Sequence, residues 1–185
     1  MRNSYMEKRA AIPAEERAKK NEAVCKSVLA SATYRFADTL LLYYPREDEV
    51  DVLHIARAAL EAGKKVAFPK CHPEDKSMEF HFVSSLDGFH KGEYDIMEPG
   101  ESLGIYDKSN SPRDNCICIV PAVVYDKKGY RIGYGGGYYD RYLSGFRGTV
   151  VGIAYRDFII PNVPHGRFDL AVDVLISEGG IYAKG

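Results

Sequence analysis

The fold is decided by the stretch TLLLYYPREDEVDVLHIARAALEAGKKVAFP, residues 39–69. The compact apolar run Thr39–Tyr44 predicts a buried strand, and Val66–Phe68 predicts a second strand that ends at Pro69. Between the two, apolar residues recur at helical spacing until Gly63, which is a natural stop for a helix. A strand–helix–strand unit of this length predicts a parallel pair of strands joined by a right-handed crossover.

Outward from this unit, strands and helices continue to alternate. A helix is predicted over about 14–32, with a possible shorter helix over 2–11 and a break at Pro13. Residues 84–114 are rich in Gly, Pro, Asp and Ser and are expected to be largely irregular. Further strands are expected at 78–82, 116–124, 149–155 and 171–176, with a short helix at about 138–144. We therefore expect one α/β domain over residues 1–185, with helices covering a sheet.

The composition narrows the class of protein further. A net charge of −1 gives no overall attraction to nucleic acid or to anionic membranes, and the longest apolar runs are too short to cross a bilayer. The charged start of the chain does not resemble a signal peptide, so we expect a cytoplasmic protein. The four cysteines form no CxxC pair and the His residues are scattered, which disfavours a zinc site and a disulfide framework.

The residues best suited to ligand binding and catalysis lie in the stretch VPAVVYDKKGYRIGYGGGYYDRYL, residues 120–143. A buried strand is expected to end near Tyr125, and four glycines lie within the five residues 133–137, directly before the start of a helix. Glycines let a ligand approach backbone N–H groups closely, and the start of a helix favours an anion. The loop therefore predicts a polyphosphate site, and a glycine-rich surface turn is the alternative.

Charged residues flank this loop. Arg131 and Arg141 would add charge-assisted bonds to phosphate oxygens, and Asp140 would hold a magnesium ion beside the phosphates. The chain contains no GxxxxGK[ST] sequence, so it is not a P-loop protein. The glycines come late in the chain and match GxGxxG only loosely, which disfavours a dinucleotide-binding domain.

The run from Arg131 to Leu143, preceded by Val120-Pro121-Ala122, resembles the signature of the 5-formyltetrahydrofolate cyclo-ligases, also called methenyltetrahydrofolate synthetases. Weaker similarity extends over nearly the whole chain, at Lys8-Arg9-Ala10, Tyr44-Pro45, Glu49-Val50-Asp51, Gly63 to Pro69, Met78-Glu79-Phe80, Ile96 to Pro99, Gly152 to Tyr155, Asp169 and Asp173.

The resemblance implies a three-layer α/β/α fold with a mostly parallel, Rossmann-like sheet. It also implies an ATP-dependent, irreversible closure of 5-formyltetrahydrofolate to 5,10-methenyltetrahydrofolate, with release of ADP and phosphate and with magnesium as cofactor. In such a reaction ATP phosphorylates the formyl oxygen, N10 attacks the activated carbon, and phosphate leaves. We expect the substrates as partners, no nucleic acid or membrane, and a monomer.

The same resemblance assigns roles to residues of this chain. Catalytic roles are expected for Arg131, Tyr138 and Asp140. ATP-binding roles are expected for Arg2, Arg131, Gly133, Tyr134, Gly135, Gly136, Gly137, Tyr138 and Tyr139. Folate-binding roles are expected for Tyr44, Glu49, Ile96, Tyr134, Gly135, Gly136, Gly137 and Tyr138. Magnesium is expected at Asp140 and Asp173.

Each assignment has a simpler alternative. Glu49 would also suit the cap of the following helix, and Asp173 would suit an outward position on a strand. Tyr138 and Tyr139 would suit a core, and Arg2 would suit a solvated chain end.

The chain also departs from the family's pattern. Phe158 stands where the family usually has Gln, and Phe168 stands where it usually has His. The chain as given starts after the position of a further Lys that the family usually has ahead of Arg2, so we expect a weaker contact with ATP there.

Two other functions remain open on the residues alone. A phosphosugar isomerase or binding module would use the glycine loop without ATP, although no acid–base pair for enolisation stands out. A folate or nucleotide binder without catalytic activity would use the same loop. ATP hydrolysis that depends on 5-formyltetrahydrofolate separates all three.

Overall fold

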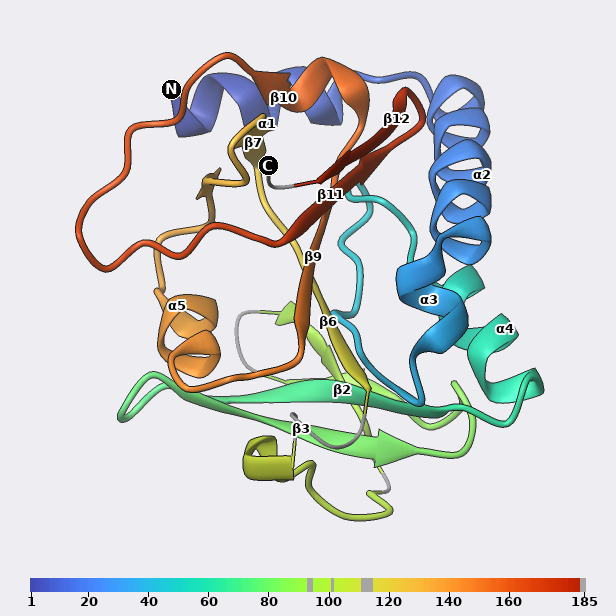
Figure 1. Cartoon of the computed structure of the whole chain (residues 1–185). Coiled ribbons are helices and arrows are strands. Elements are labelled where there is room, and N and C mark those ends of the chain that lie inside the picture. Colours follow the sequence, from blue (N-terminus) through green and yellow to red (C-terminus); the bar gives the residue numbers. More distant parts are fainter. Residues whose placement is uncertain (93–94, 101, 111–114, 184–185) are drawn as a thin grey trace.

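A seven-stranded sheet forms the centre of the structure, a computed structural model that describes residues 1–92, 95–100, 102–110 and 115–183. Five neighbouring strands run parallel, and an antiparallel strand completes each edge (Figure 1). In order across the sheet the strands are β12 (Gly180–Ala183), β11 (Val174–Ser177), β9 (Thr149–Ile153), β6 (Cys116–Val120), β1 (Thr39–Leu41), β2 (Lys65–His72) and β3 (Ser77–Val83). This confirms an α/β fold with a large, mostly parallel sheet.

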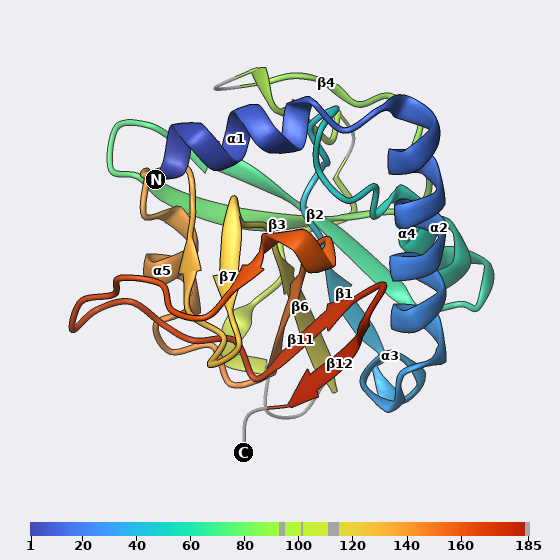
Figure 2. The same ribbon diagram turned by 90° about the horizontal axis from the view of Figure 1, so that it is seen from above.

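One face of the sheet is covered by α2 (Ala14–Ala30), α3 (Ala32–Phe36) and α4 (Leu53–Glu61) (Figures 1 and 2). The buried residues of α2 and α4 recur at helical spacing and pack into the main core, as Val24 and Val28 do in α2 and Ile55 and Ala59 do in α4. The unit from β1 through α4 to β2 joins two parallel strands, as the sequence predicts.

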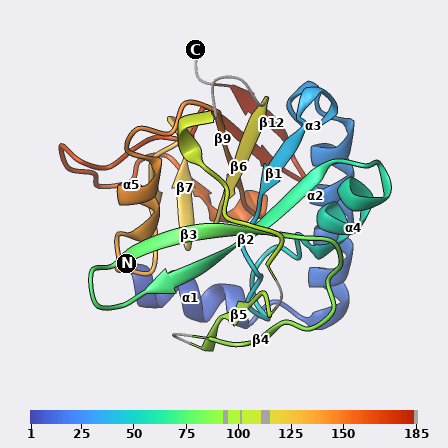
Figure 3. The same cartoon turned by 90° about the horizontal axis from the view of Figure 1, so that it is seen from below.

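The opposite face carries α5 (Tyr138–Leu143) and a small second sheet, and both lie on the far side from α2, α3 and α4 in Figure 3. The small sheet consists of β10 (Ile159–Ile160), β7 (Val124–Asp126) and β8 (Arg131–Ile132). A third layer therefore exists, and it contains strands as well as a helix. Helix α1 (Arg2–Ala10) lies over the carboxyl ends of the parallel strands, as seen from above in Figure 2.

Several predicted boundaries were wrong for local reasons. The helix predicted over about 14–32 is α2, which ends two residues earlier, because Ser31 is extended and its Oγ accepts the N–H of Tyr34 to begin α3. The strand predicted over 116–124 is two strands, since β6 ends before Pro121 and β7 begins at Val124 in the other sheet. Strand β2 continues past Pro69, where it pairs with β3 alone, and a strand with one neighbour tolerates proline.

Several short elements were not predicted from the sequence as separate elements. These are β7, β8, β10 and β12, together with η3 (Arg156–Phe158). The region 84–114 is largely irregular where it is described, with the short pair β4 (His90–Lys91) and β5 (Met97–Glu98) and the turn η2 (Lys108–Asn110). The rest of that prediction, at 93–94, 101 and 111–114, lies outside the described residues. In the described part of the chain, no helix combines the length and apolar character needed to span a bilayer.

Candidate active site

A cleft of about 630 Å³ opens at the carboxyl ends of the parallel strands. Its walls come from the loop after β1, the β2–β3 hairpin, Pro121 after β6, the glycine loop with the start of α5, and Arg2 of α1. The chain runs from β1 to β2 in one direction across the sheet and from β6 through β9 to β11 in the other. Ligands of open α/β sheets bind at such a reversal, and the volume suits a small molecule.

The glycine loop forms one wall of the cleft between β8 and α5. Gly135 and Gly137 have φ values of +100° and +70°, which side chains rarely adopt. A Cβ on Gly135 would lie 2.9 Å from Nη1 of Arg2, so the loop and α1 pack closely. A Cβ on Gly133, by contrast, would meet no atom within 4 Å. Arg141 is not among the residues that line the cleft, and its Nη1 donates to the carbonyl of Gly136 at 2.9 Å.

Arg131 and Asp140 stand at the two ends of this loop and bond to each other. Nη2 of Arg131 donates to Oδ1 of Asp140 at 2.8 Å, and Nη1 donates to the carbonyl of Leu170 at 2.8 Å. Only 6% of the Arg131 side chain is exposed, whereas 33% of that of Asp140 is. Arg131 is thus held in the wall of the cleft with its charge partly compensated.

Two further arginines reach the cleft from other elements. Arg2 is exposed and packs against Gly135. Its guanidinium has no hydrogen bond or ion pair to another described residue. Arg46 lies with its guanidinium 4.8 Å from the ring centroid of Tyr134, a cation–π contact. The cleft therefore offers positive charge at the glycine loop and at the loop after β1.

Glu49 is a buried carboxylate in the cleft wall, with 5% exposure. Oε1 accepts the hydroxyl of Tyr134 at 2.6 Å, and Oε2 accepts the N–H of Arg46 at 2.8 Å. Burial raises the pKa of Glu49, while these two bonds and the charge of Arg9 oppose the rise. The helix-cap alternative lacks support in the described contacts, since Asp51 accepts the N–H of Leu53 at the start of α4.

Arg9 lies behind Glu49 and Tyr134 and is 4% exposed. Its Nε donates to Oδ2 of Asp48 at 2.8 Å, Nη1 donates to the carbonyl of Ala122 at 2.8 Å, and Nη2 donates to the hydroxyl of Tyr134 at 2.5 Å. Burial by itself would lower the pKa of Arg9, but Tyr134 and Asp48 raise it above its usual value. The guanidinium therefore stays charged in the interior.

Aromatic and apolar side chains complete the cleft. Tyr44 packs on Phe89 at 5.0 Å between ring centroids, and Phe89 packs edge-on against Phe68 at 5.0 Å. Ile96 and Tyr138 also line the cleft. The hydroxyl of Tyr139 is buried and has no hydrogen-bond partner among the described residues, and burial raises its pKa.

The structure brings together the site residues expected from the sequence, except for Arg141 and Asp173. The cleft is lined by Arg2, Tyr44, Glu49, Ile96, Arg131, Gly133, Tyr134, Gly135, Gly136, Gly137, Tyr138, Tyr139 and Asp140. Asp173 is not among the lining residues. It is exposed, and its Oδ2 accepts the N–H of Val150 at 2.8 Å, as suits a residue just before a strand. No role was predicted for Arg9 or Arg46, although Arg9 lies within Lys8-Arg9-Ala10 and Arg46 directly follows Tyr44-Pro45, two segments that resemble the family.

No group of three or more His, Cys, Asp or Glu residues in the described ranges is arranged to hold a metal ion. Asp140 and Asp169 are the aspartates of the cleft wall. Asp169 accepts the N–H of Gly166 at 2.6 Å. One carboxylate combined with substrate phosphates is a usual way for magnesium to bind, so the residues present fit a metal that arrives with a nucleotide.

The fold and the cleft define an α/β protein that binds small molecules at the reversal of its strand order. The model of the 5-formyltetrahydrofolate cyclo-ligase family matches residues 1–178. This chain therefore belongs to the 5-formyltetrahydrofolate cyclo-ligase family, whose members are ligases of folate metabolism.

Individual relatives agree with this membership. The chain is 25% identical over 177 residues to the 5-formyltetrahydrofolate cyclo-ligase of Mus musculus, covering 91% of this chain and 87% of that one. It is 26% identical over 178 residues to the enzyme of the same name from Haemophilus influenzae, covering 91% of each. The structure of Aquifex aeolicus 5,10-methenyltetrahydrofolate synthetase superposes with a TM-score of 0.84 at 30% identity, covering 99% of this chain and 90% of that one. The phosphosugar alternative is therefore set aside.

Proposed function

We propose that this chain closes 5-formyltetrahydrofolate to 5,10-methenyltetrahydrofolate at the expense of ATP, through a phosphorylated formyl intermediate. The formyl oxygen attacks the γ-phosphorus of ATP, and the bond from that phosphorus to the bridging oxygen breaks to release ADP. N10 then attacks the formyl carbon and loses its proton, and the carbon–oxygen bond breaks to release phosphate. The product is the methenyl bridge between N5 and N10.

The glycine loop is the proposed site of the ATP phosphates. Phosphoryl transfer depends mainly on positioning and on neutralising charge. Gly133 leaves open space beside its backbone, and the positive φ of Gly135 and Gly137 shapes a loop that only glycine accepts without strain. Arg2 has no charged partner among the described residues, so its guanidinium is available to a phosphate. Arg131 adds a second positive charge at the other end of the loop.

Glu49 is the proposed anchor of the pterin ring. The pterin presents an amino group and a ring N–H side by side, and a carboxylate accepts such a pair of donors. Each oxygen of Glu49 receives one bond from the protein, and a carboxylate oxygen has two lone pairs, so each retains a place for a ligand donor. Tyr44 and Ile96 would then form apolar walls beside the ring.

Asp140 is the proposed magnesium ligand. Its Oδ1 bonds to Arg131, while its Oδ2 receives no hydrogen bond from the described part of the chain. Magnesium bound there with ATP would neutralise charge on the phosphates. Asp173 lies outside the cleft lining, with its carboxylate bonded to the backbone of Val150, and the proposal therefore rests on Asp140.

The observation that carries this proposal is that the glycine loop and Glu49 line the same cleft in a member of this family. Phosphate release, measured with each substrate alone and with both together, tests it. We expect release only with both, with one phosphate for each folate closed. Binding of both ligands without phosphate release would instead indicate a binder that lacks catalytic activity.

A further inference from the structure

We propose that Arg9 is a positioning residue that fixes the Tyr134 hydroxyl and keeps Glu49 ready to accept the pterin ring. This inference rests on the proposed function and adds a residue that does not line the cleft. Arg9 lies on α1, whereas Tyr134 lies in the glycine loop and Glu49 follows β1. It therefore joins the two halves of the site from behind.

The direction of every bond in this chain of three residues is forced. A guanidinium carries only donors, so the oxygen of Tyr134 must accept from Nη2 of Arg9. The single hydrogen of that hydroxyl is then given to Oε1 of Glu49, at 2.6 Å. If Arg9 were absent, the Tyr134 oxygen would lose the donor that holds it from behind, and the bond from its hydroxyl to Glu49, which favours the charged carboxylate, would be held less firmly.

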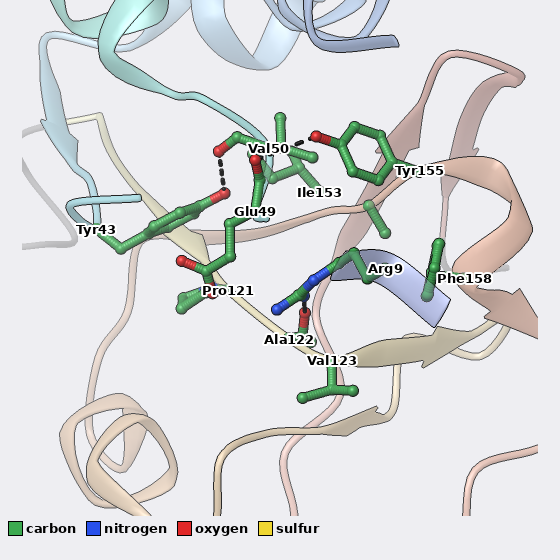
Figure 4. A pocket seen from close by; sticks show the side chains of 11 residues that line it. Arg9, Tyr43, Glu49, Val50, Pro121, Ala122, Val123, Ile153, Tyr155 and Phe158 are labelled. Carbon is green, nitrogen blue, oxygen red and sulfur yellow. Dashed lines mark hydrogen bonds between the residues drawn. The ribbon is translucent and has the colours of Figure 1, made fainter. Parts of the chain in front are cut away.

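Arg9 acts through Tyr134 because each of its three side-chain nitrogens already donates a hydrogen bond within the protein. Its remaining nitrogens bond to Asp48 and to the carbonyl of Ala122. Figure 4 shows the guanidinium beside Ala122, with the carboxylate of Glu49 beside Pro121. The small cavity between these side chains has a volume of about 10 Å³, the size of one water molecule and too small for a substrate group. Contact between Arg9 and folate is thus excluded in this arrangement.

The charges around Glu49 indicate in which direction the loss of Arg9 would shift the pKa of this carboxyl group. Arg9 and the hydroxyl of Tyr134 favour the carboxylate, while Asp48 opposes it. The backbone N–H of Arg46 also bonds to the carboxylate. Glu49 interacts electrostatically with Tyr43, Tyr125 and Tyr139, and its backbone carbonyl accepts the hydroxyl of Tyr155. Without Arg9, both the loss of its charge and the unpaired Asp48 raise the pKa of Glu49. Folate binding would then fail at a higher pH.

The test compares Arg9→Met and Arg9→Lys with Lys8→Met, all on α1. Lys8 is exposed, so its replacement removes one positive charge from the same helix without touching the network. For Arg9→Met we expect the KM for 5-formyltetrahydrofolate to rise about 10-fold, as for a lost bond to a charged group, with the KM for ATP nearly unchanged. The acidic limb of kcat/KM for folate moves to higher pH. Arg9→Lys keeps the charge and recovers part of both effects.

Equal changes in both KM values together with an unmoved pH profile would overturn the proposal and leave Arg9 a purely structural residue. Should Arg9→Met fail to fold, a double-mutant cycle of Arg9→Lys with Tyr134→Phe decides the matter. The double variant is expected to bind folate no worse than Tyr134→Phe alone, since both changes break the same hydrogen-bonded chain from Arg9 through Tyr134 to Glu49. Additive losses would contradict it. Wild-type turnover, measured in parallel, separates failure of this inference from failure of the proposed function.

Discussion

Arg131 and Asp140 stand nine residues apart in the chain and meet at 2.8 Å across the base of the glycine loop. The bond joins the first residue of β8 to the first turn of α5, so the glycines between them are held at both ends. Gly137, in a left-handed conformation, begins the helix directly after the loop. A loop fixed in this way is prepared for a ligand before the ligand arrives, which reduces the ordering that binding requires.

Replacing Asp140 by Asn tests the proposed magnesium ligand. Asn still accepts a hydrogen bond from Arg131 but offers no negative charge to the metal. We expect kcat to fall by at least about 100-fold, as for loss of a main electrostatic contact, with the melting temperature nearly unchanged. Asp173→Asn, outside the cleft lining, is the matched control. Near-normal turnover by Asp140→Asn would remove this residue from the metal site.

Two glycine substitutions test whether the glycine loop is a phosphate-binding site or a glycine-rich surface turn. A Cβ on Gly133 meets no protein atom within 4 Å, so Gly133→Ala is expected to leave stability unchanged and to raise the KM for ATP by blocking the phosphates. Gly135→Ala is expected to lower stability as well, by about 1–2 kcal/mol for its positive φ. Thermal unfolding and initial rates at varied ATP give both quantities. Unaltered ATP kinetics in Gly133→Ala would favour the surface turn.

Glu49→Ala is expected to weaken folate binding much more than ATP binding. The carboxylate is the buried acceptor proposed for the pterin, and its loss should raise the KM for folate by about 10- to 100-fold. Asp51→Ala is a suitable control, because Asp51 accepts the N–H of Leu53 and its loss should cost helix stability alone. Steady-state kinetics with each substrate varied in turn decide the question. A similar loss for both substrates would argue against a pterin anchor.

The buried charge of Glu49 also has a consequence for stability. Because burial raises its pKa, the folded chain holds a proton there at a pH where the unfolded chain has lost it. The stability contributed by this carboxyl is therefore present below the unfolded pKa of about 4.3 and is lost as the pH rises through the folded value. Urea unfolding across this range should show wild type gaining stability relative to Glu49→Gln as the pH falls. A difference independent of pH would contradict the assignment.

The parts of the fold that follow from local pattern were predictable from the sequence. The apolar run beginning at Thr39 and the helical spacing through Ala59 indicated β1, α4 and their parallel partner β2. The ends of elements depended on contacts between distant segments. Strand β1 ends at Leu41, although Leu42 still donates its N–H to the carbonyl of Ala67 in β2. Beyond it, Tyr43 and Tyr44 line the cleft, and Leu42 and Tyr43 remain as buried as the strand itself.

In the candidate site, too, features that depend on consecutive residues were predictable, whereas features that depend on distant segments were not. The glycine loop could be recognised because its composition is unusual and its function requires consecutive residues. Arg9 could not be, since an arginine in a charged amphipathic helix looks solvated until α1 is placed over Ala122 and Tyr134. Asp173 stands in an apolar run, yet it is exposed, and only the structure shows that its carboxylate bonds to the backbone of Val150.

The most direct test is the absorbance of the methenyltetrahydrofolate band after the protein is mixed with 5-formyltetrahydrofolate, ATP and magnesium, with each component omitted in turn. We expect a rise that requires all three and that stops when ATP is exhausted. An unchanged band with the complete mixture, from protein shown to be folded by circular dichroism, would contradict it.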